Sequence, residues 1–238
     1  MHSLFIKLKK LFLKTILSGY RRKLQKPYCI IPIGTYCLPR TITTLSKLKP
    51  RRKEGEKTMP FDLAFFNDVS AIIRLIETQF TEFYQGLEFD PEKQLWENKK
   101  LSAIFNHDGH LNDEAFKKRY DARIANFYDA LRNKETRKFF VLASFAEISQ
   151  EQMNSLVHTL RKHTQGDSFT IIYINQTQKK TTYTNSCVKV LDTDYKRIWF
   201  DHINKEGNWA GELKNKDAPS AINFYYKVSI DIAKAMQG

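Results

Sequence analysis

The chain has 238 residues, of which 42% are hydrophobic and 13% aromatic, a composition that favours one folded domain and excludes wholesale disorder. Its formal net charge is +13, but eight basic residues lie within residues 1–26, which contain no acidic residue, so the remaining chain is only weakly basic. That remainder has no RNA-recognition signature, so we do not expect nucleic acid as a partner.

Residues 1–26 form a basic segment, distinct from a single α/β domain that we expect over residues 27–238. Apolar residues recur in it at helical spacing and predict an amphipathic helix: Phe5, Leu8, Phe12 and Ile16. Lysines interrupt its apolar runs well short of the ~18 residues of a transmembrane helix, and no signal-peptide cleavage site follows. The helix suits the anionic cytoplasmic surface of the inner membrane, where we expect a peripheral protein; the alternative is packing on the domain or on a partner subunit.

Beyond Pro27, strand-like and helix-like segments alternate. In chain order, the pattern predicts a strand at 28–33, helices at 38–48 and 69–84, a strand at 101–107, a helix at 112–132, a strand at 138–144, a helix at 150–163, strands at 169–175 and 186–192, and a helix at 217–236. The lysine-rich stretch 47–57 between two of the helices is interpreted as an exposed loop. This alternation is typical of an α/β fold, and we expect a mainly parallel, doubly wound sheet in a Rossmann-like three-layer sandwich.

Polar residues stand where several predicted strands end, the position at which open α/β sheets bind ligands. They are Gly34, Thr35, Tyr36 and Cys37 after the first strand, Asn106, His107 and Asp108 after a later one, and Asn175. The sequence therefore predicts a site at the carboxyl edge of the sheet.

Cys37 is the candidate nucleophile, because a cysteine in the first turn of a helix has its pKa lowered by the helix dipole and the free N–H groups. Gly34 would permit the tight turn, and N–H groups near Cys37 could hold an oxyanion. His107 is the candidate general base, oriented by Asp108 or Asp62.

Several alternatives stay open at this point. Cys37 could be a buried packing residue, as we interpret Cys29 and Cys187, which lie in strand-like apolar runs; the three cysteines form no paired framework and predict free thiols in a reducing compartment. A weak metal-binding alternative uses His107, Asp108, His110, Asp201 and His202. We expect no metal and no other cofactor.

Four blocks in this order resemble the bacterial DUF1796 family, whose members are described as papain-like cysteine peptidases. The blocks are IPIGTYCLPR (Gly34, Cys37), MPFDLAFF (Pro60, Phe61, Asp62), FNHDGH (His107, Asp108) and KKRYDARIANFYDAL (Tyr120, Arg123), with NWAGE at 208–212 as a weaker fifth. The sequence departs from the family pattern at Pro32, where serine is usual, at Leu63, where tryptophan is usual, and at Gly109, where an aromatic residue is usual.

The resemblance implies a cysteine-dependent acyl transfer or hydrolysis, with Cys37, His107, and Asp108 or Asp62 as the catalytic residues. Gly34, Thr35, Tyr36, Arg123 and Asn175 are the candidate substrate-binding residues. The family setting implies bacterial surface-polysaccharide biosynthesis, with a glycan or lipid-linked glycan as substrate and an acyl donor. A non-catalytic glycan-binding accessory protein is the alternative, and a glycosyltransferase-like enzyme is a third option, although the sequence has no clear Asp-x-Asp motif or phosphate loop.

Overall fold

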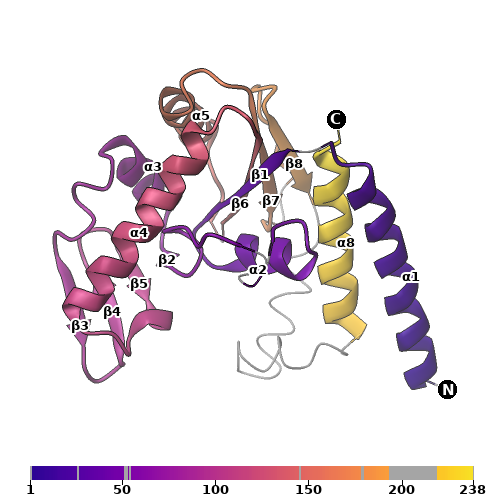
Figure 1. Ribbon diagram of the computed structural model, residues 1–238, viewed down its shortest axis with the longest axis horizontal. Helices are drawn as coiled ribbons and strands as arrows, with labels where there is room; N and C mark the ends of the chain where they lie inside the picture. The colour runs from indigo at the N-terminus through magenta and orange to yellow at the C-terminus, as the bar shows by residue number, and fades with distance from the viewer. Residues whose placement is uncertain are drawn as a thin grey trace.

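The computed structural model describes residues 2–25, 27–50, 53, 55–144, 146–177, 180–192 and 219–237, without the side chains of residues 2–7, 10 and 219–224. Its centre is a parallel four-stranded sheet in the order β1-β6-β7-β8 (Figure 1). The strands are β1 (Tyr28–Gly34), β6 (Arg137–Ser144), β7 (Phe169–Asn175) and β8 (Val188–Asp192). β6 and β7 are buried along nearly their whole length, as expected for central parallel strands covered on both faces.

Helices cover both faces of this sheet and make three layers (Figure 1). One face, which carries Ile31 and Phe140, packs against α3 (Val69–Glu77), α4 (Asp113–Arg132) and α5 (Gln150–His163). The other, which carries Ile30 and Val141, packs against α1 (His2–Arg22), α2 (Leu38–Leu45) and α8 (Pro219–Ala235). The prediction of an α/β fold with a parallel sheet is confirmed.

The doubly wound order is not confirmed. Within the described part of the chain, the four parallel strands follow one another across the sheet in chain order. A doubly wound sheet reverses its strand order at one point, and these strands contain no such reversal.

A second, antiparallel sheet lies within the connection from β1 to β6, in the order β2-β5-β4-β3. It consists of β2 (Phe65–Phe66), β3 (Leu87–Asp90), β4 (Leu95–Asn98) and β5 (Ala103–Phe105). It joins the end of β1 through a hydrogen bond of 2.9 Å from the Phe66 N–H to the Thr35 carbonyl. Only β5 was predicted from the sequence. The sequence feature that indicates the turn of the β3–β4 hairpin is Asp90 followed by Pro91. The Asp90 carboxylate accepts hydrogen bonds from the N–H groups of Glu92 and Lys93 in this turn.

The predicted helix over 69–84 is wrong in its second half, because α3 ends at Glu77. The end is a Schellman turn: the N–H of Phe80 donates to the Leu75 carbonyl at 2.8 Å, and that of Gln79 to Ile76 at 3.2 Å. Gln79 and Phe80 both take positive φ values there, and the turn sends the Phe80 ring into the core. By contrast, α4 begins after Asn112, as predicted, and α5 begins at its predicted first residue, Gln150, with Ser149 as its cap.

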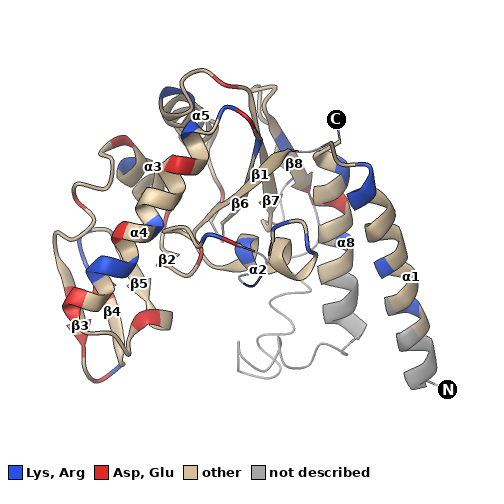
Figure 2. Cartoon of the chain, viewed as in Figure 1, with Lys and Arg blue, Asp and Glu red and all other residues tan. Residues whose placement is uncertain are grey.

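The basic helix α1 is joined to the domain along its second half. Leu17 is buried in the core shared with α8, and the Gln237 side chain donates to the Tyr20 carbonyl at 2.9 Å. Basic residues occur along the length of α1, and no acidic residue lies on it (Figure 2). No helix in the described residues is long and apolar enough to cross a membrane. The predicted opening residue of the last helix, Asp217, lies outside the described residues; α8 begins at Pro219.

Candidate active site

Cys37 stands at the junction between β1 and α2, where the sequence predicted it. β1 ends at Gly34, and a Cβ at this position would lie 2.8 Å from the Ala143 carbonyl oxygen and 3.0 Å from Cγ of Pro39. Glycine is therefore required for the close approach of β6 and α2. Cys37 follows as the N-cap residue of α2, with φ −72° and ψ −2°.

The Cys37 thiol is buried, with 7% of the residue exposed, and this burial raises its pKa. A hydrogen bond with the Thr41 side chain and the positive charge of Arg40 both lower the pKa, but by less than burial raises it. The predicted lowering of the pKa is therefore wrong. α2 is only eight residues long, and Pro39 removes one of the free N–H groups at its start, so its field on the sulfur is small.

His107 lies in the 3₁₀ turn η2 (Asn106–Asp108) that follows β5. The residue is exposed to solvent, but the atoms that surround its ring partly desolvate it and lower its pKa. Asp108 acts to raise that pKa, whereas the positive charges of Arg40 and Arg123 lower it further. The imidazole is thus neutral at neutral pH and able to accept a proton. In the described residues no hydrogen bond joins it to the Cys37 sulfur.

The Asp108 carboxylate is bound by its own cluster rather than by His107. Its oxygens accept from Arg119 Nη1 at 2.7 Å, from the Tyr120 hydroxyl at 3.1 Å, and from Arg123 Nη1 and Nη2 at 2.8 and 3.3 Å. Burial raises the pKa of Asp108, but the hydrogen bonds and charge of Arg123, with those of Arg119 and Tyr120, lower it overall.

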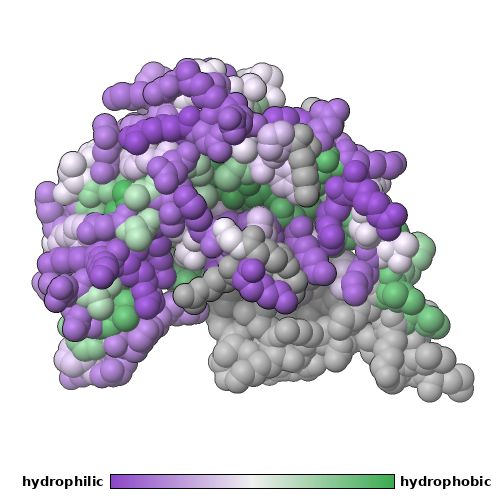
Figure 3. Space-filling view, viewed as in Figure 1, coloured by the Kyte–Doolittle hydropathy of each residue, from purple (hydrophilic) through white to green (hydrophobic). Residues whose placement is uncertain are grey.

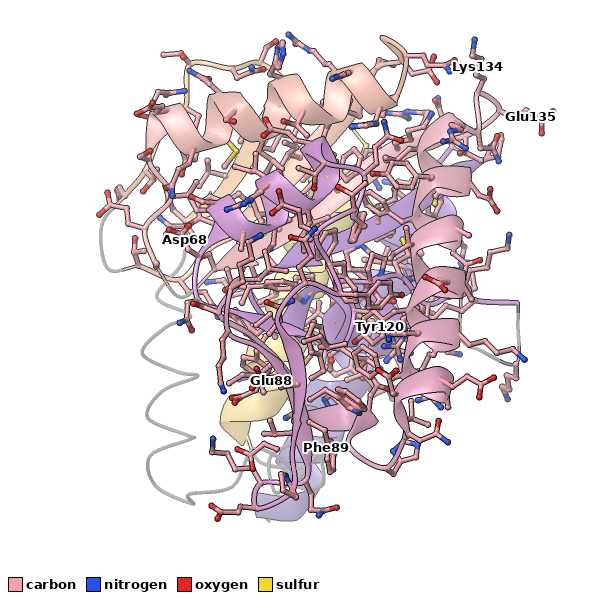
Figure 4. All side chains as sticks on the ribbon, turned by 90° about the vertical axis from the view of Figure 1, so that its left-hand side faces the viewer. Asp68, Glu88, Phe89, Tyr120, Lys134 and Glu135 are labelled. Carbon is pink, nitrogen blue, oxygen red and sulfur yellow. The ribbon has the colours of Figure 1, made fainter. Side chains whose placement is uncertain are left out.

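Arg123 is itself buried and lies over the Tyr120 ring, 4.4 Å from the ring centroid. Figure 4 shows Tyr120 in the packed interior between α4 and the antiparallel sheet. Two predicted roles are therefore not met. Asp108 does not orient His107 through a hydrogen bond, and Arg123 is engaged by Asp108 instead of facing a substrate.

Asp62 belongs to a second buried ionic cluster. One of its oxygens accepts from Lys49 Nζ at 3.1 Å and from the Met59 N–H at 3.0 Å, and Arg40 Nε lies 3.5 Å from the same atom. Glu56 completes the cluster, at 3.2 Å from Lys49 and 3.3 Å from Arg40. Burial raises the pKa of Asp62, against the opposing charge of Lys49. Asp62 likewise makes no hydrogen bond to His107 in the part of the chain described.

Sequence analysis missed Arg40, Lys49 and Glu56 as members of this cluster. It placed Lys49 in an exposed loop, whereas only 3% of the residue is exposed. Nothing in the stretch distinguishes this lysine from its neighbours, because the partner that buries it, Asp62, lies farther along the chain.

The remaining predicted residues line the carboxyl edge of the parallel sheet. Thr35, Tyr36 and Asn175 are all buried, and burial raises the pKa of the Tyr36 phenol. The Asn175 amide donates to Asp192 at 2.7 Å and to Thr181 at 3.2 Å, so it holds the ends of β7 and β8 together. The sheet register places Ser144 beside Asn175.

The metal alternative gains no support. The described residues contain no group of three or more His, Cys, Asp or Glu side chains that could hold a metal ion. Asp201, His202 and the NWAGE block lie outside the described residues. Cys29 and Cys187 pack against the hydrophobic core, which confirms their interpretation as packing residues.

A pocket of about 270 Å³ lies at the opposite end of β1, lined by Cys29, Lys49, Met59 and Asn126 among others, and it does not reach Cys37 or His107. We take the carboxyl edge as the candidate site, because the polar residues converge there.

Comparison with protein-family models, with curated proteins and with solved structures finds no match to this chain.

Proposed function

We propose that the protein is a cysteine-dependent enzyme of acyl transfer or hydrolysis, with Cys37 as nucleophile and His107 as general base. One observation carries the proposal: Cys37 lies at the carboxyl end of β1, and the positive charge of Arg40 acts on the pKa of both Cys37 and His107. Parallel sheets bind their ligands at that edge. Helices on both faces agree with the Rossmann-like sandwich that we keep as part of this proposal.

The ionisation of the two groups determines the mechanism. Burial keeps Cys37 as a thiol, and His107 is neutral, so the pair does not begin as thiolate and imidazolium. Instead, His107 removes the thiol proton while the sulfur attacks the substrate carbonyl and its π electrons move to the oxygen. N–H groups at the start of α2 stabilise that oxyanion. The imidazolium then protonates the leaving group, and an acyl group remains on Cys37.

The second half-reaction releases the acyl group. His107, neutral again, takes a proton from water or from a sugar hydroxyl, whose oxygen attacks the thioester; the Cys37 sulfur leaves and takes that proton back from the imidazolium. Water as acceptor makes the protein a hydrolase, and a sugar makes it a transferase. The substrate class, a glycan or lipid-linked glycan of a bacterial surface polysaccharide, follows only from the resemblance to the DUF1796 family.

A second candidate is a non-catalytic glycan-binding protein that assists polysaccharide assembly. The burial of Cys37 and the pairing of Asp62 and Asp108 with cations favour it, because no third group among the described residues orients His107 through a hydrogen bond.

Trapping of the acyl-enzyme separates the two candidates. We expect incubation with a p-nitrophenyl ester to leave one acyl group on Cys37, located by peptide mass spectrometry. His107→Gln should slow acylation by about 10²–10⁴-fold, the usual contribution of a general base. His110→Gln is the matched control, because His110 is an exposed neighbour with no role in the proposal. Equal acylation of Cys29 and Cys187, or no effect of His107→Gln, would favour the binding protein.

A further inference from the structure

The helix α1 carries two separate apolar faces. Leu13, Ile16, Leu17 and Tyr20 pack into the core shared with α8. Leu8, Leu11 and Phe12 face solvent, with 57, 61 and 64% of each residue exposed. The two sets have the same spacing but are shifted by five positions, which puts them about 140° apart around the helix axis. The exposed set is therefore not part of the domain core.

The exposed set forms one apolar patch bordered by positive charge. Residues 8, 11 and 12 follow the helical spacing i, i+3, i+4. Exposed Lys9 and Lys14 lie beside them, and residues 1–26 contain no acidic residue. Figure 3 shows hydrophobic residues gathered on the outer side of α1, at one edge of the molecule. An apolar patch bordered by Lys9 and Lys14, on a segment without acidic residues, matches the chemistry of a lipid surface with anionic head groups.

The patch lies at the same end of the molecule as the candidate active site. α1 ends where β1 begins, and the start of α1 lies at the end toward which β7 and β8 point (Figure 1). From Arg22 back to Leu8–Phe12 the helix rises about 15–21 Å, and β1 runs about 20 Å from Tyr28 to Gly34. The start of α1 therefore lies toward the carboxyl end of the sheet rather than toward its amino end (Figure 1).

We propose that Leu8, Leu11 and Phe12 insert into an anionic membrane surface and that this docking holds the carboxyl edge of the parallel sheet beside the bilayer. The second half of α1 stays packed on α8 and acts as the rigid base of the contact. The binding step is independent of the chemistry proposed for Cys37. Its consequence, that the substrate is itself membrane-bound, rests on that proposed function.

Vesicle co-sedimentation of the full chain tests the docking. We expect binding to phosphatidylcholine–phosphatidylglycerol vesicles and little binding to phosphatidylcholine alone. Phe12→Ser should weaken partitioning about tenfold, because it removes one large apolar side chain from the lipid contact. Ile104→Ser, which removes an exposed apolar side chain from the antiparallel sheet, should leave binding unchanged. Lys9→Gln with Lys14→Gln should weaken binding to the anionic vesicles only.

The proposal fails if the wild-type chain binds neither vesicle, or if Phe12→Ser binds as the wild type does. It also fails if Phe12→Ser abolishes self-association measured by sedimentation while vesicle binding is absent, since the patch would then contact a second copy. Circular dichroism checks that each variant is folded. Cys37→Ala should bind vesicles as the wild type does, so that loss of docking and loss of acylation are scored separately.

Discussion

Replacement of Asp108 by asparagine tests whether this residue is a structural anion or a catalytic one. Asp108 is fully buried and neutralises Arg123, of which only 6% is exposed. Asp108→Asn keeps the shape of the side chain but removes its charge, so Arg123 remains buried without a counter-ion. Breaking a buried ion pair from one side costs about 3–5 kcal/mol. Because asparagine still accepts a hydrogen bond, we expect about 3 kcal/mol, a decrease of roughly 6–12 °C in Tm for a chain of this size.

Urea unfolding followed by circular dichroism measures this loss. Asp113→Asn is the matched control: Asp113 lies at the start of the same helix, and its ion pair with Lys117, at 2.8 Å, is exposed. The control should lose less than about 1 kcal/mol. If Asp108→Asn loses no more than Asp113→Asn, the buried ion pair does not stabilise the fold and the structural interpretation of Asp108 is refuted.

The pH dependence gives an independent check on the same residue. Folding lowers the pKa of Asp108. Its contribution to stability is therefore complete above the unfolded carboxyl pKa of ~3.9 and is lost as the pH falls through the lower folded value. The difference between the wild type and Asp108→Asn should be constant near neutral pH and shrink in acid. A difference that grows in acid would contradict the assignment.

Three further predictions follow from the carboxyl edge of the sheet. Gly34→Ala should lower the free energy of unfolding by about 1–3 kcal/mol, because its Cβ would overlap the Ala143 carbonyl oxygen. Gly19→Ala is the control: its Cβ meets nothing within 4 Å, and it should raise the free energy of unfolding by about 0.5–1 kcal/mol in the same urea titration. Iodoacetamide should alkylate Cys37 more slowly in the folded than in the unfolded chain at pH 7, and faster as the pH rises; rapid labelling at mildly acidic pH would refute the raised pKa. The rate of Cys37 acylation should fall in acid with a midpoint below the ~6.5 of free imidazole, since the pKa of His107 is lowered, and a midpoint above it would exclude His107 as the base.

The sequence motifs predicted the position of the two carboxylates in the candidate site but not their hydrogen-bond partners. The pattern placed Asp62 and Asp108 near His107, and the structure does bring all three to the region around Arg40 and Arg123. Hydrogen bonding within that region depends on which cations arrive from other elements. Lysine and arginine are abundant in this chain, so the sequence offers many possible partners for each carboxylate and does not indicate which are buried with them.

The same limit explains why most of the antiparallel sheet was not predicted from the sequence. Its strands are two to four residues long, and a strand that short carries too few side chains to display an alternating pattern. What stabilises it is the cluster of aromatic rings against α3 and α4, among them Phe83, Phe105 and Phe116. These contacts join segments that are far apart in the chain.

The sequence by itself determined the α/β class, the parallel strands and the positions of α4 and α5, because apolar periodicity and polar caps are local properties. It also placed Cys37 after a strand and at the start of a helix. Only the tertiary structure decided the strand order, the end of α3, the burial of Cys37 and the partners of Asp62 and Asp108. The physical reason is that burial and charge pairing depend on residues from several elements at once, and a pKa follows from that environment rather than from the neighbouring sequence.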